Sequence, residues 1–231
     1  MQRRNLYIIG LAWLISIAVA GAAISTDQIK RLQNAAEVVR ALRTQADNGI
    51  PENLWDKAEC VAVIPGLKKA AFGVGGEYGK GVMSCRNNGR WSAPLFMQLA
   101  KGSWGLQIGA TEIDLVLLVM NRDGADKLLS NKVALGADAS AAAGPVGRAA
   151  AAGTDLQMRA EILSYSRARG VFAGIDISGG ALGPDKDDNT DVYGADKNPK
   201  TIVFGNGRPV PEAEPFLKAL AMPAAAASSR R

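Results

Sequence analysis

The spacing of apolar residues along the chain first predicts two helices. After Ser25, a residue typical of helix starts, apolar side chains recur every three or four positions from Ile29 to Leu42. Asn48-Gly49 ends this pattern. Residues 51–55 begin with proline and predict a short second helix. Together these segments form a predicted amino-terminal helical pair.

The apolar pattern then becomes typical of β-strands. Residues 60–64 form a short apolar run that Pro65-Gly66 closes, and residues 70–85 are rich in glycine. Because glycine permits bulges and tight curvature, this segment predicts antiparallel strands that curve and cross closely. Residues 87–89, Asn-Asn-Gly, predict a hairpin turn. Residues 113–120, the most continuous apolar run outside the amino-terminal segment, predict a central buried strand.

The second half of the chain alternates short helices and strands. Residues 123–129 predict a helix, and residues 161–167 and 171–177 predict two antiparallel strands joined by a basic turn. Residues 201–204 predict a last strand, and residues 211–220 a last short helix. The predicted fold class is therefore α+β, with a curved glycine-rich antiparallel sheet or barrel-like core, the amino-terminal helical pair, and short helices between strands.

Residues 135–148 contain almost no bulky side chains. Gly136, Gly144 and Pro145 weaken any helix there. Small side chains let backbone pass close to backbone or to a ligand. Because this stretch lies between the predicted buried strand and the arginine-bearing hairpin, we expect close-packed backbone that ends in a phosphate contact at Arg148.

The amino terminus has the pattern of an export signal. Two arginines precede an apolar run over residues 6–19, and small residues follow it. The run is short for a membrane span, which needs about 20 residues, although a retained anchor is the alternative. We therefore expect residues 1–23 to be a signal peptide, residues 24–222 a single domain, and residues 223–231 a disordered tail.

Export also bears on the cysteines, Cys60 and Cys85, which are the only two in the chain. An oxidising compartment favours a disulfide between them, which would stabilise the fold by about 3 kcal/mol. The alternative is a pair of buried thiols. The expected location is periplasmic or secreted, with association at a membrane.

Charge and composition narrow the function. Lysine and arginine exceed aspartate and glutamate by 27 to 22, a mild excess that suits an anionic surface. The chain has no histidine, which excludes Ser-His-Asp and Cys-His nucleophile systems, histidine acid-base catalysis and the commonest zinc sites. We therefore expect no enzymatic activity and no cofactor. An enzyme would have to rest on the acids Glu112, Asp114, Asp138 and Asp176.

Basic residues supply the candidate binding sites. Guanidinium groups suit phosphate oxygens because they present a planar fork of donors. The candidates for an anionic lipid headgroup are Arg148, Arg159, Arg167, Arg169, Lys68 and Lys69. The polar face of the first helix offers a membrane contact through Lys30, Arg31, Arg40 and Arg43. The alternative is that these side chains are simply solvated and that the apolar stripe of this helix packs on the core.

One acidic segment has the spacing of a calcium loop. Acids or amides fall at its first, third, fifth, seventh and twelfth positions, which are Asp185, Asp187, Asn189, Asp191 and Asp196. Thr190 stands at the sixth position, where such loops require glycine, and no clear helix precedes the segment. Calcium binding is therefore not favoured.

Two blocks, residues 135–148 and 163–174, resemble the paired signature of the SYLF domain family. The second block reads Leu-Ser-Tyr-Ser-Arg-Ala-Arg-Gly-Val-Phe-Ala-Gly, and the similarity covers about residues 30–195. The resemblance implies a lipid-binding module, with affinity for phosphoinositides in eukaryotic members and an actin-binding role in fungal ones. Bacterial relatives are typically small exported proteins, and this chain is similar to them in its signal and in having no appended SH3 or FYVE module.

Residues and resemblance together predict a binding protein. We expect non-catalytic binding of anionic phospholipid, with phosphoinositide-like headgroups, at a membrane surface through basic residues. The alternative is a cell-envelope structural or protein-interaction module without lipid specificity. The expected partners are thus an anionic lipid or membrane surface, or an envelope protein, and no nucleic-acid partner is expected.

Overall fold

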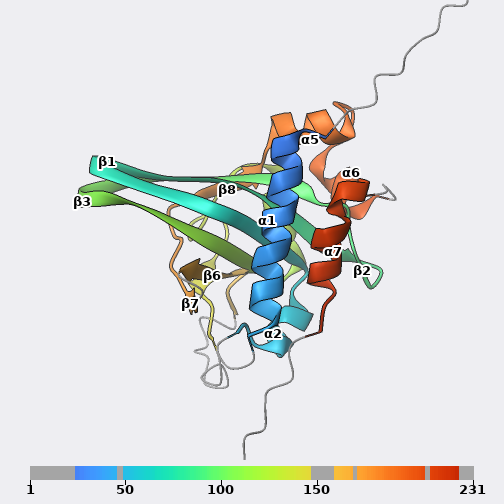
Figure 1. The fold of residues 1–231 in the computed structure, drawn as a ribbon, viewed down its shortest axis with the longest axis horizontal. Coiled ribbons are helices and arrows are strands. Elements are labelled where there is room, and N and C mark those ends of the chain that lie inside the picture. The colour runs from blue at the N-terminus through green and yellow to red at the C-terminus, as the bar shows by residue number, and fades with distance from the viewer. Residues whose placement is uncertain (1–23, 46–48, 147–158, 169–170, 206–208, 224–231) are drawn as a thin grey trace, which may run out of the picture.

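The computed structural model describes residues 24–45, 49–146, 159–168, 171–205 and 209–223 (Figure 1). Within β1 and β3, only the backbone of residues 70–74 and 103–110 is described. The predicted signal peptide and nearly all of the predicted tail lie outside the described residues. In chain order the elements are α1 (Thr26–Arg43), α2 (Glu52–Lys57), β1 (Cys60–Asn87), β2 (Arg90–Trp91), β3 (Leu95–Val119), α3 (Arg122–Ser130), β4 (Val133–Ala134), β5 (Ala141–Ala143), β6 (Ile162–Ala168), β7 (Val171–Gly174), β8 (Ala181–Pro184), α5 (Lys186–Tyr193), α6 (Pro199–Phe204), η2 (Pro211–Ala213) and α7 (Glu214–Leu220).

The predicted amino-terminal helical pair is present as α1 and α2. Ser25 caps α1 in a reciprocal capping box with Gln28, in which each side chain bonds the other residue's backbone N–H. Helix α1 ends at Arg43, earlier than the apolar pattern predicted. Pro51 precedes the short helix α2, where its missing N–H costs no helical hydrogen bond.

Two long strands, β1 and β3, form the frame of the sheet. They pair antiparallel from Cys60 opposite Val119 to Met83 opposite Leu95. The prediction that Pro65-Gly66 ends a short strand is wrong, because β1 continues through a register shift at that point. Gly66 has a φ of 63°, which glycine adopts without strain, and its N–H donates to the Asp114 carboxylate over 3.0 Å. This bulge bends the strand without breaking it.

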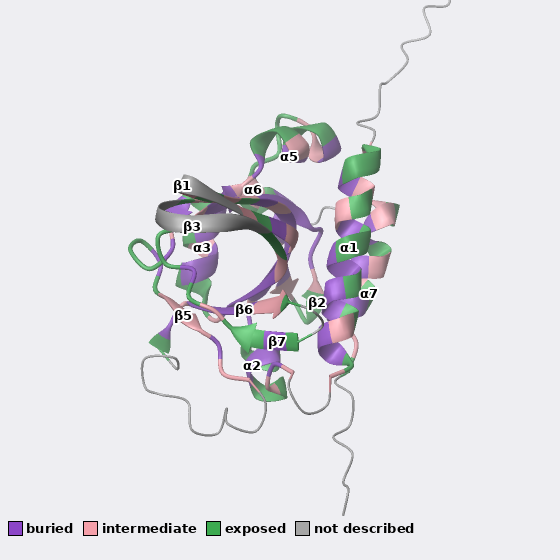
Figure 2. Ribbon diagram, turned by 60° about the vertical axis from the view of Figure 1, so that its left-hand side comes forward, coloured by how far each residue is buried: buried purple, intermediate pink, exposed green. Residues whose placement is uncertain are grey.

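The paired strands β1 and β3 fold over on themselves, and glycines make the crossing possible. A Cβ atom built on Gly81 would lie 2.1 Å from the carbonyl oxygen of Val63, so the two halves of β1 touch backbone to backbone. The amino-terminal half of β3 pairs with β8, and its carboxyl-terminal half pairs with β6. The result is a curled half-barrel sheet of eight strands, visible end-on in Figure 2. The predicted α+β class and curved antiparallel sheet are confirmed.

Both faces of the curled sheet are buried where residues 60–64 pair with residues 115–119. Alternate residues such as Val61 and Val63 pack with α1, α2 and α7, whereas Ala62 and Ile64 pack with α3 and α6 on the other side. The predicted central strand, residues 113–120, lies between β1 and β6, and its residues 115–119 are fully buried there. This arrangement explains why its sequence is apolar at every position.

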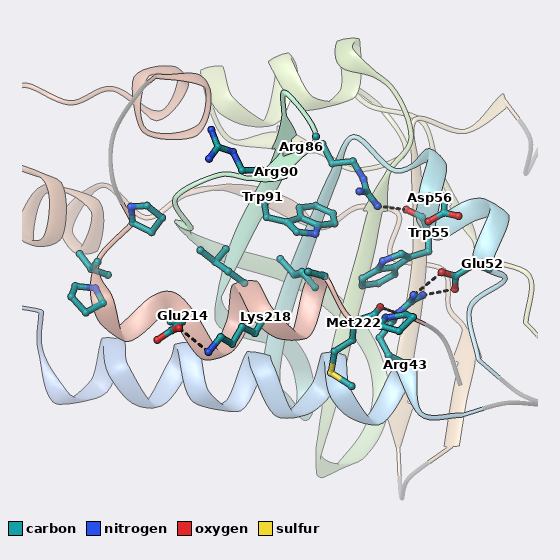
Figure 3. A pocket seen from close by; sticks show the side chains of 18 residues that line it. Arg43, Glu52, Trp55, Asp56, Arg86, Arg90, Trp91, Glu214, Lys218 and Met222 are labelled. Atoms are coloured by element: carbon teal, nitrogen blue, oxygen red, sulfur yellow. Dashed lines mark hydrogen bonds and ion pairs between the residues drawn. The ribbon is translucent and has the colours of Figure 1, made fainter. Parts of the chain in front are cut away.

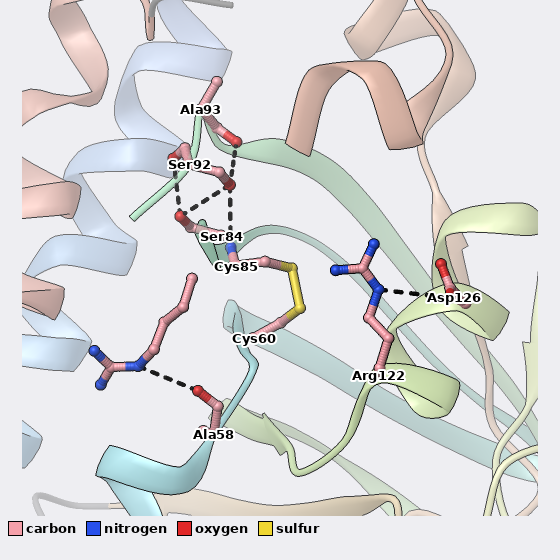
Figure 4. Close-up of a disulfide and its surroundings, with 9 residues drawn as sticks. Ala58, Cys60, Ser84, Cys85, Ser92, Ala93, Arg122 and Asp126 are labelled. Carbon is pink, nitrogen blue, oxygen red and sulfur yellow. Dashed lines mark hydrogen bonds and ion pairs between the residues drawn. A yellow bond between two sulfur atoms is a disulfide. The ribbon is translucent and has the colours of Figure 1, made fainter. Parts of the chain in front are cut away.

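A disulfide joins Cys60 to Cys85, at the two ends of β1 (Figure 4). Both residues are buried in the apolar cluster that faces α3 and α6. Next to the bond, the Ser92 hydroxyl accepts a hydrogen bond from the backbone N–H of Cys85 over 3.1 Å. The bond therefore links the start and the end of the folded strand.

One prediction for the carboxyl-terminal third is wrong. Residues 201–204 belong to helix α6 rather than to a strand, because Asn198 caps the helix and Pro199 occupies its first turn. Residues 186–193 form helix α5, capped by Asp185, where a calcium loop was considered. None of the described helices is both long enough and apolar enough to span a bilayer.

Candidate functional site

A basic pocket lies between the first half of α1 and the crossing of β1. Its volume is about 270 Å³. Helix α1 contributes one wall, and β1 contributes residues from both of its halves, because Leu67 and Gly79 meet where the strand crosses itself. The lining residues are Asp27, Lys30, Arg31, Asn34, Pro65, Gly66, Lys68, Tyr78, Gly79 and Lys80.

Lys30 and Lys68 are the two unpaired cations among the described residues of this pocket. Both are exposed, and within the described part of the chain neither has an ion-pair or hydrogen-bond partner. The strand register places Lys68 opposite Glu112, although no ion pair joins the two. Asp27 is the one acid in the pocket lining. The pocket therefore presents two ammonium groups that could bind an anion.

The other two cations of the pocket are already bound by acids from α5. Arg31 donates to the Asp188 carboxylate over 2.5 Å, and Lys80 lies 2.7 Å from Asp185 and 3.1 Å from Asp188. Gln28 completes the cluster with a 3.2 Å hydrogen bond to Asp188. This network ties α1, β1 and α5 together and fixes the rim of the pocket.

The charges in this network shift one another's pKa values. Burial alone would raise the pKa of Asp188, but the hydrogen bonds from Arg31 and Gln28 hold it well below its usual range. Burial alone would lower the pKa of Lys80, but its hydrogen bonds to Asp185 and Asp188 raise it above the usual value. Asp188 and Lys80 are therefore both charged at neutral pH.

Tyr78 stands beside the lysines with 49 % of its surface exposed. Among the described residues, only Val171 is also a large apolar side chain with this degree of exposure. An exposed tyrosine next to lysines is typical of surfaces that meet a membrane interface, because its ring is apolar and its hydroxyl is polar.

The remaining headgroup candidates do not converge on this pocket. Arg167 is bound by Asp114 through 2.6 and 2.8 Å contacts, and Lys69 pairs with Glu77 at 3.1 Å. Arg159 is exposed. Arg148 and Arg169 lie outside the described residues. Among the predicted headgroup residues that the structure describes, Lys68 is therefore the only one that lines the basic pocket.

Only two of the four basic residues predicted to form the membrane face of α1 are free to meet a membrane. Lys30 and Arg40 are exposed, and Arg31 is bound by Asp188. Arg43 is buried at the far end of the helix, where Glu52 accepts two 2.6 Å hydrogen bonds from it. Its guanidinium also donates to the Met222 carbonyl over 2.9 Å. Arg43 thus anchors α2 and the end of α7 to α1 and does not face solvent.

The candidate calcium residues have structural positions. Asp185 caps α5 and pairs with Lys80, and Asn189 exchanges hydrogen bonds with the backbone of Phe96. Asp187 and Asp191 are exposed, and Asp196 pairs with Lys197 on the surface. Across the described residues, no group of three or more metal-binding side chains comes together.

The acids weighed for catalysis are also dispersed. Asp114 binds Arg167 and the bulge at Gly66, and Asp138 accepts a hydrogen bond from the backbone N–H of Ala134. The Ser178 hydroxyl and N–H donate to Asp176, which lowers the pKa of that carboxyl. These contacts shape turns and strand ends.

Sequence reasoning missed Tyr78, Lys80 and Asp188. Their positions follow from the crossing of β1 and from the docking of α5, which join segments far apart in the chain. The calcium-like spacing of acids over residues 185–196 drew attention to the segment that contains Asp185 and Asp188, although these acids bind Lys80 and Arg31. Asp185 and Asp188 are three residues apart, a spacing that places both on one face of a helix, and this spacing could have indicated that they act together.

Comparison with known proteins decides the family. Residues 100–222, more than half of the chain, match the family described as Ysc84, Las17-binding protein actin regulator. The chain belongs to the Ysc84 family. The resemblance to the SYLF domain family is thereby confirmed.

Curated relatives share the same region. The chain is 32 % identical over 179 residues to LAS seventeen-binding protein 3 of Saccharomyces cerevisiae, covering 76 % of this chain and 39 % of that protein. It is 32 % identical over 180 residues to Protein YSC84 of the same yeast, covering 76 % and 38 %. It is 31 % identical over 182 residues to the human SH3 domain-containing YSC84-like protein 1, covering 75 % and 53 %. The chain thus spans between about two fifths and one half of these relatives, and the name of the first of them describes a binding protein.

Proposed function

We propose that this protein is a non-catalytic binding module that attaches to anionic phospholipid at a membrane surface through its basic pocket. One observation carries the proposal: Lys30 and Lys68 lie in the same pocket, exposed and without partners in the described part of the chain. Each lysine near an anionic membrane contributes about 1 kcal/mol of attraction.

The surroundings of the two lysines support a membrane ligand. Arg31 and Lys80 form a fixed rim behind them, and because Asp185 and Asp188 balance the charge of that rim, Lys30 and Lys68 are the cations left to bind a ligand. Exposed Tyr78 offers a ring that can enter the headgroup layer beside the lysines. The pocket is small, at about 270 Å³, which suits a headgroup rather than an acyl chain.

Vesicle flotation tests the proposal directly. The full chain is mixed with vesicles of phosphatidylcholine alone, and with vesicles that also contain phosphatidylglycerol or a phosphatidylinositol phosphate. We expect flotation with the anionic vesicles only, and loss of flotation at high salt, which screens exposed charges. Equal flotation with neutral vesicles, or no flotation at all, would contradict the proposal.

The second candidate function is protein interaction. The family is described as Las17-binding and actin-regulating, and one yeast relative is named for LAS seventeen binding, which favours a protein partner for this chain too. Such a role needs no lipid, so a partner recovered equally well with and without vesicles would favour it over the lipid role.

The proposed location is the cell envelope or the secreted fraction. The Cys60–Cys85 disulfide supports export, because disulfides persist in oxidising compartments. Fractionation of cells that express the full chain tests this proposal, which predicts the protein in the periplasm, on the envelope or in the medium.

A further inference from the structure

A larger groove lies along α7, between that helix, α2 and the turn from β1 to β2 (Figure 3). Its volume is about 780 Å³, within the range of natural binding pockets. It borders the carboxyl-terminal end of α1, whereas the basic pocket borders the amino-terminal end. The groove is therefore a separate surface.

The floor of the groove is apolar and incompletely buried. Trp91, Val210 and Leu217 line it, and each packs only partly against the core beneath. Trp55 lies under Trp91 with a ring-to-ring distance of 6.4 Å and is itself 1 % exposed. This support holds the Trp91 ring in place while leaving part of it accessible.

Two arginines stand over this floor. The Arg86 guanidinium lies 4.4 Å from the centre of the Trp91 ring and is held there by hydrogen bonds to the backbone carbonyls of Ala58 and Trp55. Arg90 is exposed and has no partner within the described ranges. Neither arginine is neutralised by an acid of the chain in the described region.

The acids of the groove lie elsewhere. Glu52 is bound by Arg43, and Glu214 by Lys218 at 2.7 Å. Asp56 has no partner among the described residues, and Figure 3 shows it at the opposite end of the groove from Arg90. Two of the three acids are thus paired with bases of the groove itself, and the Arg90 end remains positive.

We propose that this groove binds a short peptide segment of a partner protein in which a large apolar side chain stands next to a carboxylate. The apolar side chain rests on Trp91 and Leu217, and the carboxylate pairs with Arg90, whereas Arg86 stays stacked on the Trp91 ring. Tryptophan and arginine are the residues that most often dominate the energetics of protein interfaces. Asp56 disfavours a second acid at its end and sets the direction of the peptide.

Selection from a random linear peptide library displayed on phage, with the full chain as bait, tests the proposal. Enriched peptides are then synthesised and titrated by fluorescence polarisation against the wild type, Arg90→Glu and Leu217→Ala. The Arg90 side chain makes no hydrogen bond or ion pair in the described part of the chain, so Arg90→Glu should leave the thermal unfolding temperature unchanged. Lys132→Glu, an exposed position away from the groove, is the matched charge control.

The expected result is a consensus of an acidic residue beside a large apolar one, with binding weakened about tenfold or more by Arg90→Glu and by Leu217→Ala. Lys132→Glu should bind like the wild type. No enrichment, a consensus without an acid, or peptides that bind Arg90→Glu as tightly as the wild type would overturn the proposal. Because Arg90 lies outside the basic pocket, Arg90→Glu should still float with anionic vesicles, which separates this proposal from the lipid one.

Discussion

The carbonyl oxygen of Val63 stands where a side chain on Gly81 would have to lie, since a Cβ built there would be 2.1 Å away. The neighbouring atom is backbone and cannot rotate aside. We therefore expect Gly81→Ala to lower the free energy of unfolding by about 3 kcal/mol or more, measured by urea denaturation.

The control for this substitution is Gly102→Ala, in the partner strand. A Cβ on Gly102 would meet nothing within 4 Å. We expect its unfolding free energy to stay within about 0.5 kcal/mol of the wild type. Equal stability of Gly81→Ala and Gly102→Ala would mean that the two halves of β1 do not cross at Val63.

Gly144 makes a second close contact, with Tyr165. A Cβ at this position would lie 2.0 Å from Cζ of the buried tyrosine ring, and the carbonyl of Gly144 itself occupies the space beside Gly174. Gly144→Val should therefore lower the thermal unfolding temperature before it changes vesicle binding. A variant with full thermal stability and no vesicle binding would instead make this stretch part of the binding site.

The lowered pKa of Asp188 should make the free energy of unfolding depend on pH. Because its pKa is held well below the usual value in the fold, ionised Asp188 stabilises the protein above the unfolded-state pKa of about 3.9, and this contribution is lost as pH falls toward the lower folded pKa. Asp188→Asn should lower the unfolding free energy by about 2 kcal/mol at neutral pH, since Arg31 and Lys80 lose a charged partner.

This difference between wild type and Asp188→Asn should shrink as pH falls below about 4. The measurement is a series of urea denaturation curves from neutral to acidic pH. Asp187→Asn is the control and should show little effect, because Asp187 is exposed in the same helix and has no hydrogen-bond or ion-pair partner among the described residues. A wild-type advantage that is unchanged by acid would refute the assigned role of Asp188.

Two measurements test the disulfide: the free energy of unfolding without it, and the number of free thiols in the wild type. The closed loop spans 25 residues in sequence separation, and the double substitution Cys60→Ala with Cys85→Ala should lower the unfolding free energy by about 3 kcal/mol. Thiol titration of the unfolded, unreduced wild type should find no free thiol. Two titratable thiols per chain would contradict the bond.

Much of the fold was predictable because its signals are local. Capping at Ser25, the period of α1 and the turn at Asn88-Gly89 each depend on neighbouring residues, and Asn88 and Gly89 do adopt positive φ values of 51° and 77°. Glycine enrichment over residues 70–85 correctly indicated curvature and close crossing. Helix α6 was missed because its short apolar run, Thr201 to Phe204, has no period that separates helix from strand.

The candidate site was less predictable because its members come from distant segments. Lys30 and Lys68 were each singled out, but for different surfaces, and only the crossing of β1 under α1 places them in one pocket. Arg31 and Arg43 looked equally exposed on the helix, yet Asp188 and Glu52 bind them. Charge patterns reveal which residues are basic, whereas tertiary packing decides which of them stay free.

The central claim is that Lys30 and Lys68 together bind an anionic headgroup. Its most direct test is the affinity of Lys30→Glu with Lys68→Glu for phosphatidylcholine vesicles that contain phosphatidylglycerol, measured by flotation beside Lys57→Glu with Lys132→Glu. The control pair makes the same change in net charge at exposed positions outside the pocket. We predict that the pocket pair weakens binding about tenfold or more while the control pair changes it by less than about threefold. Equal losses from the two pairs, or no loss from either, would contradict the claim.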